Sequence, residues 1–322
     1  MDIPQKKDFP PKTMLNIIIA ISAYSSAIFI LYFVNTQNDW TFKILGAFLF
    51  SLVGNTIFSL LHESVHGCFS WNKKINYIFG VISGSFFPTS FTIQKHCHLG
   101  HHRRNRTDVE MFEMYYPTDN IMMKKLQLYT IVTGCYWTSP IIGCSAFLFF
   151  PNLLKINLLR SKDPDIQHMS ADAMISDLER SHPIISRLEI IYTILFQASL
   201  FYFLNLSFLS WLLCYWSFAI AWGGLQYADH AWTKRDVKTG AWNLKVNPLF
   251  RFFYLNYHDH KVHHMYPYLP WNYLPKFVNK EEYRPEFYKI WLKLLKGPTL
   301  VTEPNPIIDN ELANIIKDQG RS

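Results

Sequence analysis

Residues 41–66 read TFKILGAFLFSLVGNTIFSLLHESVH, and they decide the fold because they join a long apolar run directly to two histidines. The run at 42–61 is long enough to cross the roughly 30 Å hydrocarbon core of a bilayer as a helix, and Lys43 can extend its charge to the outer surface. A helix that continues past the membrane carries His62 and His66 on one face, since positions four apart lie one above the other. The stretch therefore predicts a membrane helix that ends in a pair of metal ligands.

Other apolar runs reach the length of a membrane span, which predicts an all-α integral membrane protein with about four transmembrane helices. The predicted spans are residues 14–34, 42–61, 188–207 and 208–228. A fifth run, at 75–93, is interrupted by Gly and Pro, so it is interpreted as a re-entrant or interfacial segment, with a full span as the alternative. A sixth run, at 127–150, is expected to kink at Pro140.

The distribution of charge predicts the orientation. The short connections at 35–41 and 205–207 contain no Lys or Arg, whereas the N-terminal tail, the segment 62–126 and the C-terminal third are basic. By the positive-inside rule, both termini and the long connections lie in the cytoplasm, at a bacterial inner membrane or the endoplasmic reticulum. The runs at 75–93 and 127–150 then dip into the membrane or lie along it, under a cytosolic helical cap.

Eight of the 13 histidines fall into three short clusters, HESVH at 62–66, HLGHH at 98–102 and HKVHH at 260–264. Neutral imidazole is the commonest protein ligand for transition metals, and spacings of three and four residues aim the rings to one side of a helix. One tetrahedral zinc takes four ligands, so eight donors indicate two metal ions side by side. His230 ends the last span and is predicted as a ninth ligand. The predicted ligands are His62, His66, His98, His101, His102, His230, His260, His263 and His264.

The neighbours of these ligands are given smaller roles. Glu63, Gln226 and Asp259 are expected to contact the ligating rings and fix their tautomers. Read alone, HExxH is also typical of a zinc protease with Glu63 as its general base, but that interpretation leaves the other two clusters without a role. His96 and His258 point away from their clusters at helical spacing, and Cys97 is expected to be a packed thiol.

The net charge of +7 does not indicate nucleic-acid binding, because the basic residues flank membrane spans. Arg103, Arg104 and Arg106 fit an orienting role, and a site for an anionic head group is compatible with it. The five cysteines are scattered without a CxxC pair, which indicates reduced thiols. Residues 287–296 are amphipathic and are predicted to lie on the cytoplasmic leaflet, before an irregular tail and a short final helix.

The three clusters on a four-span protein resemble the membrane fatty acid desaturase superfamily, which includes hydroxylases and carotenoid ketolases. The resemblance covers roughly residues 40–275. Gln226 and His230 are similar to the Asn/Gln-xxx-His element that supplies an extra ligand in acyl-CoA desaturases. HHMYPYLPWNYLP at 263–275 is similar to the HHxxPxxPWxxLP ending of acyl-lipid desaturases and ketolases. The resemblance implies a non-haem di-iron centre that uses O2 as co-substrate and attacks an unactivated C–H bond.

The sequence also departs from parts of this family. The first cluster has three intervening residues where animal-type acyl-CoA desaturases have four, and the third begins with His260 where front-end desaturases have Gln. The HPGG haem motif is missing, so the resemblance implies a separate electron donor of ferredoxin or cytochrome b5 type. The expected substrate is a membrane lipid or another long-chain acyl group.

The most specific function expected is that of a fatty acid desaturase. A hydroxylase, a carotenoid ketolase or an alkene-forming decarboxylase stays open within the superfamily, and a metal transporter or metal-binding membrane protein stays open outside it. The chain divides into a cytosolic N-terminal tail at 1–13, a desaturase-like membrane domain at 14–275, and a cytosolic amphipathic segment and tail at 276–322.

Overall fold

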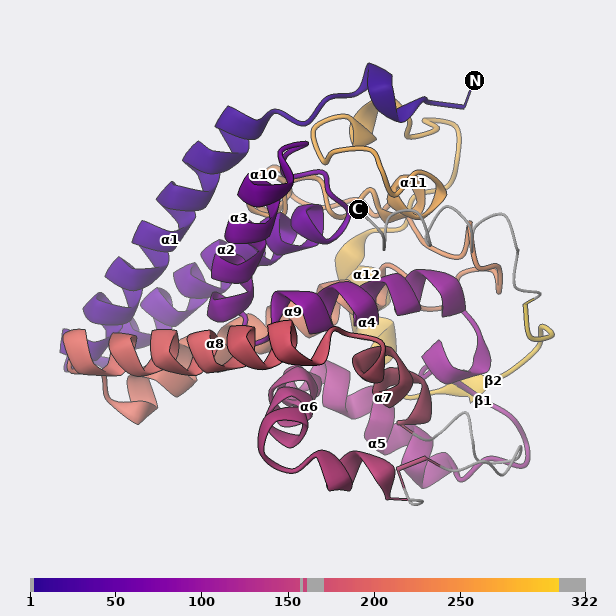
Figure 1. The fold of residues 1–322 in the computed structure, drawn as a ribbon. Coiled ribbons are helices and arrows are strands. Elements are labelled where there is room, and N and C mark those ends of the chain that lie inside the picture. The colour runs from indigo at the N-terminus through magenta and orange to yellow at the C-terminus, as the bar shows by residue number, and fades with distance from the viewer. Residues whose placement is uncertain (1–2, 157–158, 161–170, 307–322) are drawn as a thin grey trace.

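The computed structural model describes residues 3–156, 159–160 and 171–306, and this part of the chain is mostly helical (Figure 1). Four helices are long and apolar enough to cross a membrane, which confirms the predicted number of spans. They are α1 (Thr13–Thr36), α2 (Trp40–Val65), α8 (Pro183–Phe203) and α9 (Phe208–Ala228).

These helices form two hairpins, and the turns of the hairpins meet at the same end of the molecule (Figure 1). Asn35, at the end of α1, joins the turns: its Nδ2 donates to the Asn205 carbonyl at 3.0 Å, and its Oδ1 accepts from the Ser207 amide at 2.8 Å. Asp39 and Ser207 cap the second helix of each hairpin with their side-chain oxygens. The predicted short connections are therefore tight, capped turns.

Helix α2 is the central helix of the bundle. Two thirds of its apolar window (67%) is buried, against 28% for that of α8, and it packs on α1, α3 (Lys73–Phe86) and α9. Gly54 permits the close approach of α9, since a Cβ there would lie 2.7 Å from the Phe218 ring. The outer helices instead expose large side chains such as Phe29 and Leu195, which are 65% and 63% exposed. Only an apolar environment such as lipid covers such a surface favourably.

The run at 75–93 forms α3 and the beginning of α4 (Phe91–Arg104). The 14 residues of α3 rise about 21 Å, less than the hydrocarbon thickness of about 30 Å, so this run does not form a full span. The break between the two helices is held by Glu189 of α8. Its carboxylate accepts from the Ser90 hydroxyl at 2.6 Å and from the Thr92 amide at 2.8 Å.

The run at 127–150 bends by 85° between α5 (Ile121–Val132) and the helical segment Cys135–Phe149, which contains α6 (Thr138–Phe149). The kink predicted at Pro140 is wrong. The chain turns at Gly134, whose φ of +82° suits glycine. Pro140 lies in the first turn of α6, where a missing N–H costs no helical hydrogen bond.

The remaining elements surround the end of the bundle that lies away from the hairpin turns (Figure 1). Two short strands, β1 (Met114–Tyr115) and β2 (Thr299–Leu300), pair in parallel with Met114 opposite Thr299. The sequence predicts an irregular tail after Gly297, but residues 299–300 of this tail form a strand. The predicted final helix lies outside the described residues.

The short helices are α7 (Asp172–Glu179), α10 (Pro248–Phe253), α11 (His260–Met265) and α12 (Phe287–Leu294). The 3-10 turns are η1 (Lys6–Asp8), η2 (Asp108–Glu110), η3 (Cys135–Trp137), η4 (Pro151–Lys155) and η6 (Leu274–Lys276).

Candidate metal centre

The three histidine clusters converge because each lies on a helix end near the same point. His62 is in the last turn of α2, and His66 is the residue that ends this helix. Gly67 follows with φ +66°, the left-handed conformation that commonly terminates a helix. The second cluster is in α4, whose N-terminus is capped by Ser90, and the third forms most of the six-residue α11.

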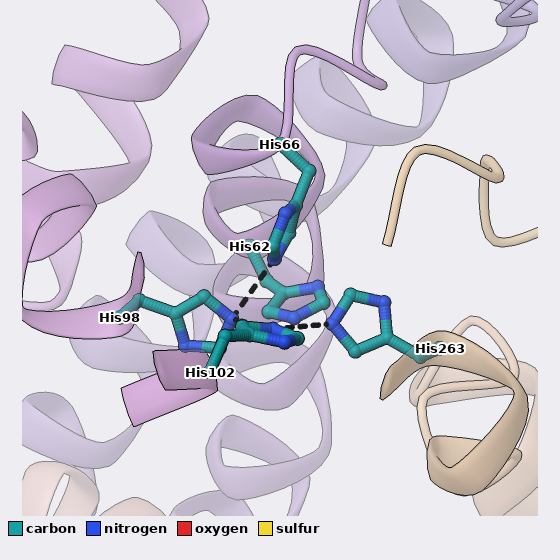
Figure 2. Close-up of side chains that lie close together, drawn as sticks. All are labelled: His62, His66, His98, His102 and His263. Carbon is teal, nitrogen blue, oxygen red and sulfur yellow. Dashed lines mark hydrogen bonds between the residues drawn. The ribbon is translucent and has the colours of Figure 1, made fainter. Parts of the chain in front are cut away.

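Five imidazoles form a first group, with one nitrogen of each lying within 4.8 Å of the others. Figure 2 shows these rings pointing toward one another from α2, α4 and α11. The Nε2 atom of His98 lies 2.9 Å from that of His66 and 3.1 Å from that of His102. The first group, which we call the five-histidine group, consists of His62, His66, His98, His102 and His263, all buried.

Four imidazoles form a second group by the same criterion. The Nε2 atoms of His101 and His230 lie 3.2 Å apart, and the His102 and His264 rings stack at 4.2 Å, which places the two groups side by side. The four-histidine group consists of His101, His230, His260 and His264. All nine residues predicted as ligands are therefore brought together, in one set of five and one of four.

The chemistry of these donors fits two transition-metal ions. Both ring nitrogens of His264 are buried and have no hydrogen-bond partner among the described residues. The same holds for Nε2 of His62. Such buried donors are costly unless something else satisfies them. Burial, with the neighbouring imidazoles, holds the pKa of His98, His102 and His264 well below 6.5. These three rings are therefore neutral at physiological pH, which is the form that binds a metal.

Contacts outside the nine rings fix the orientation of at least two of them. His230 Nδ1 lies 3.1 Å from the Gly240 carbonyl, to which it can only donate, so its Nε2 is left with a free lone pair. His101 Nδ1 lies 3.4 Å from a carboxylate oxygen of Glu110. Neither contact was predicted, because a loop carbonyl and a 3-10 turn carry no periodic sequence signal.

The three acidic or amide residues expected beside the rings have other partners. Glu63 accepts from the Trp271 amide at 3.1 Å, and Asp259 pairs with Arg284 at 2.8 Å. Gln226 accepts from the Tyr257 hydroxyl at 2.8 Å, and the Tyr257 ring packs 4.8 Å from that of His62. Gln226 therefore reaches the centre through Tyr257.

The residues expected to point away do so. His96 is half-buried on α4, and His258 is buried with its Nε2 3.7 Å from Asp259; neither belongs to the two groups. Cys97 packs against the apolar cluster of α6 and α7 and also stays outside the groups. His168, which the sequence places in a polar connection, lies outside the described residues.

The arginines after the second cluster form ion pairs with carboxylates of the same chain. Arg103 and Arg104 donate to the two oxygens of the buried Asp177, at 2.9 and 2.6 Å. Arg106 is 1% exposed and donates to Glu113 at 2.6 Å. These pairs attach α4 to α7 and to the following segment, and Arg106 has no surface to offer an anionic head group.

The comparison with known families agrees with this geometry. The family model described as fatty acid desaturase matches residues 38–294, which contain all nine histidines. No curated protein matches the chain. Since the family match covers most of the sequence, the chain belongs to the fatty acid desaturase family.

Proposed function

We propose that this protein is a membrane-bound, O2-dependent di-iron oxidoreductase that introduces a double bond into the long-chain acyl group of a lipid. The observation that carries the proposal is the set of nine convergent imidazoles, divided five and four, at the end of a bundle of four long apolar helices. Membership of the desaturase family supports an acyl substrate.

The nine histidines would hold two irons, which supply the O2 and C–H chemistry when bound. The chain's own residues bury eight of the nine rings and aim them toward one another. The Gly240 carbonyl keeps the Nδ1 proton on His230, so that the Nε2 lone pair faces the four-histidine group. The ion pairs of Arg103 and Arg104 with the buried Asp177 keep α4, and thus three of the ligands, in place.

Apolar side chains line a small cavity between α2, α3 and α9, which has room for little more than one water molecule. Phe58, Phe87 and Phe218 are among its lining residues, and polar side chains contribute little to it. Phe58 lies one helical turn before His62, and its ring packs on Tyr257, which contacts His62. An alkyl chain that displaced the rings lining this cavity would therefore approach the five-histidine group in apolar surroundings.

The metal-transporter alternative receives no support from the placement of the ligands. A transport path would place polar ligands near the middle of the spans. His62 lies in the last turn of α2, and His230 lies just beyond the end of α9. A hydroxylase, ketolase or decarboxylase shares the same metal centre, so only the product distinguishes these reactions.

Product analysis tests the reaction directly. Expression in a host that lacks comparable enzymes should give lipids with one additional double bond, detected as acyl chains lighter by two hydrogens in mass spectrometry. The His101→Ala variant, which removes a ring of the four-histidine group, serves as the inactive control. Accumulation of hydroxylated chains, ketocarotenoids or terminal alkenes instead would assign the chain to another reaction of the superfamily.

The orientation in the membrane is a second testable part of the proposal. Asn38 lies exposed in the turn between α1 and α2, where no Lys or Arg occurs between residues 35 and 41. In a Cys135→Ser background, which removes the exposed native thiol, a cysteine at Asn38 should react with an impermeant maleimide from outside the cell.

A cysteine at Thr302, exposed after β2, should react only once the membrane is opened. Labelling of the Thr302 position in intact cells would overturn the proposed orientation, in which both termini are cytoplasmic.

A further inference from the structure

Asp229 is the most unusual charged group near the histidines. Its side chain is fully buried, and within the described ranges neither carboxylate oxygen has a hydrogen-bond partner. No Lys or Arg lies within ion-pair distance of it in that part of the chain; only the imidazoles of His230 and His260 do. An isolated buried carboxylate is strongly unfavourable, so Asp229 in its ionised form needs a compensating positive charge.

The backbone adds to this cost and holds Asp229 firmly. The residue ends α9, where its amide donates to the Leu225 carbonyl at 3.3 Å and its own carbonyl accepts from the Trp242 amide at 2.6 Å. The C-terminal end of a helix carries partial negative charge, which disfavours a carboxylate there. Helix capping therefore does not explain an acidic residue at this position.

The two oxygens of Asp229 face the four-histidine group. Oδ1 lies 3.6 Å from His230 Nε2, and Oδ2 lies 3.6 Å from His260 Nδ1. His230 donates its Nδ1 proton to the Gly240 carbonyl, so its Nε2 can only accept. The lone pairs of His230 Nε2 and Asp229 Oδ1 therefore face each other. Ligands on one metal with bonds near 2.1 Å lie roughly 3–4.2 Å apart, so this separation suits a cation bound by both atoms.

The two groups also differ in their number of donors. Five histidines form one group and four form the other, and neutral imidazoles bring no negative charge to offset two buried cations. We propose that Asp229 is the anionic ligand of the four-histidine group, with Oδ1 on the metal beside His230 Nε2 and Oδ2 accepting from His260 Nδ1. This inference rests on the proposed dimetal function and gives each metal five donor residues.

Cobalt binding to the purified, metal-free full-length protein tests the assignment without turnover. Co²⁺ replaces iron in histidine and carboxylate sites, and its visible absorption reports the coordination. The wild type should bind about two ions. Asp229→Asn keeps the shape of the side chain but loses the charge. One of the two ions should therefore bind about 10–100-fold more weakly, and its absorption band should change. Asp259→Asn is the matched control: it alters another buried Asp beside the third cluster, one that pairs with Arg284, and should bind two ions as the wild type does.

The outcomes separate this inference from the proposed function. A wild type that binds fewer than two ions overturns both. A wild type and an Asp229→Asn variant that bind two ions with equal affinity and equal spectra overturn the role of Asp229 alone. Should Asp229→Asn not fold, Asp229→Glu decides the matter, since it keeps the carboxylate but lengthens it: two bound ions with an altered band support the assignment, and an unchanged band overturns it.

Discussion

Replacing His263 by alanine is expected to remove most of the bound metal and all measurable turnover, while the protein still inserts into the membrane. His263 brings α11 to the five-histidine group, with its Nε2 3.0 Å from that of His102. Loss of this ring removes a ligand directly, so the loss of affinity should exceed the roughly 10–100-fold caused by residues that only orient a ligand. The four long helices do not depend on His263, because the core of the bundle is formed by α1, α2 and α9.

Metal analysis of detergent-purified protein measures this effect, with about two irons per chain expected for the wild type. His96→Ala is the matched control, since His96 lies on α4 among the ligands but outside both groups. It should keep the wild-type metal content. A single zinc in the wild type, or full activity in His263→Ala, contradicts the dimetal interpretation.

The spans could be predicted because lipid imposes a simple requirement on the sequence: about 20 apolar residues in a row. The four runs meet it and become α1, α2, α8 and α9. The irregular runs could not be resolved in the same way, because their shape depends on single contacts. Glu189 holds the break between α3 and α4 from 97 residues away in sequence, and the left-handed Gly134, not Pro140, turns the chain before α6.

The candidate ligands could also be predicted from the sequence, but their division into a five-histidine and a four-histidine group could not. Helical spacing predicts that His98 and His102 share a face, and both belong to the five-histidine group. Which rings of the second and third clusters accompany His230 depends on how α4 and α11 pack against the end of α9. The same limit applies to Asp259, whose partner Arg284 lies 25 residues further along the chain. Asp229 has only a weak signal in the sequence, its position directly before His230, which helical spacing does not single out.

His230→Ala is expected to abolish turnover and to remove metal from the four-histidine group. His230 is the only member of either group that comes from none of the three clusters, and it connects the end of α9 to the centre. Its ring lies 4.7 Å from the rings of both His101 and His264. An open position at this point disturbs both the affinity for the ion and its redox chemistry.

His258→Ala provides the matched comparison, because His258 is another buried histidine near the third cluster. It is 2% exposed, against 6% for His230, yet its ring faces Asp259 and lies outside both groups. Removing it should lower stability by the few kcal/mol typical of a truncated buried side chain while the metal content per folded chain stays unchanged. Turnover normalised to the yield of folded protein therefore distinguishes the two positions. If His230→Ala keeps wild-type turnover while His258→Ala is inactive, the ninth ligand has been assigned to the wrong histidine.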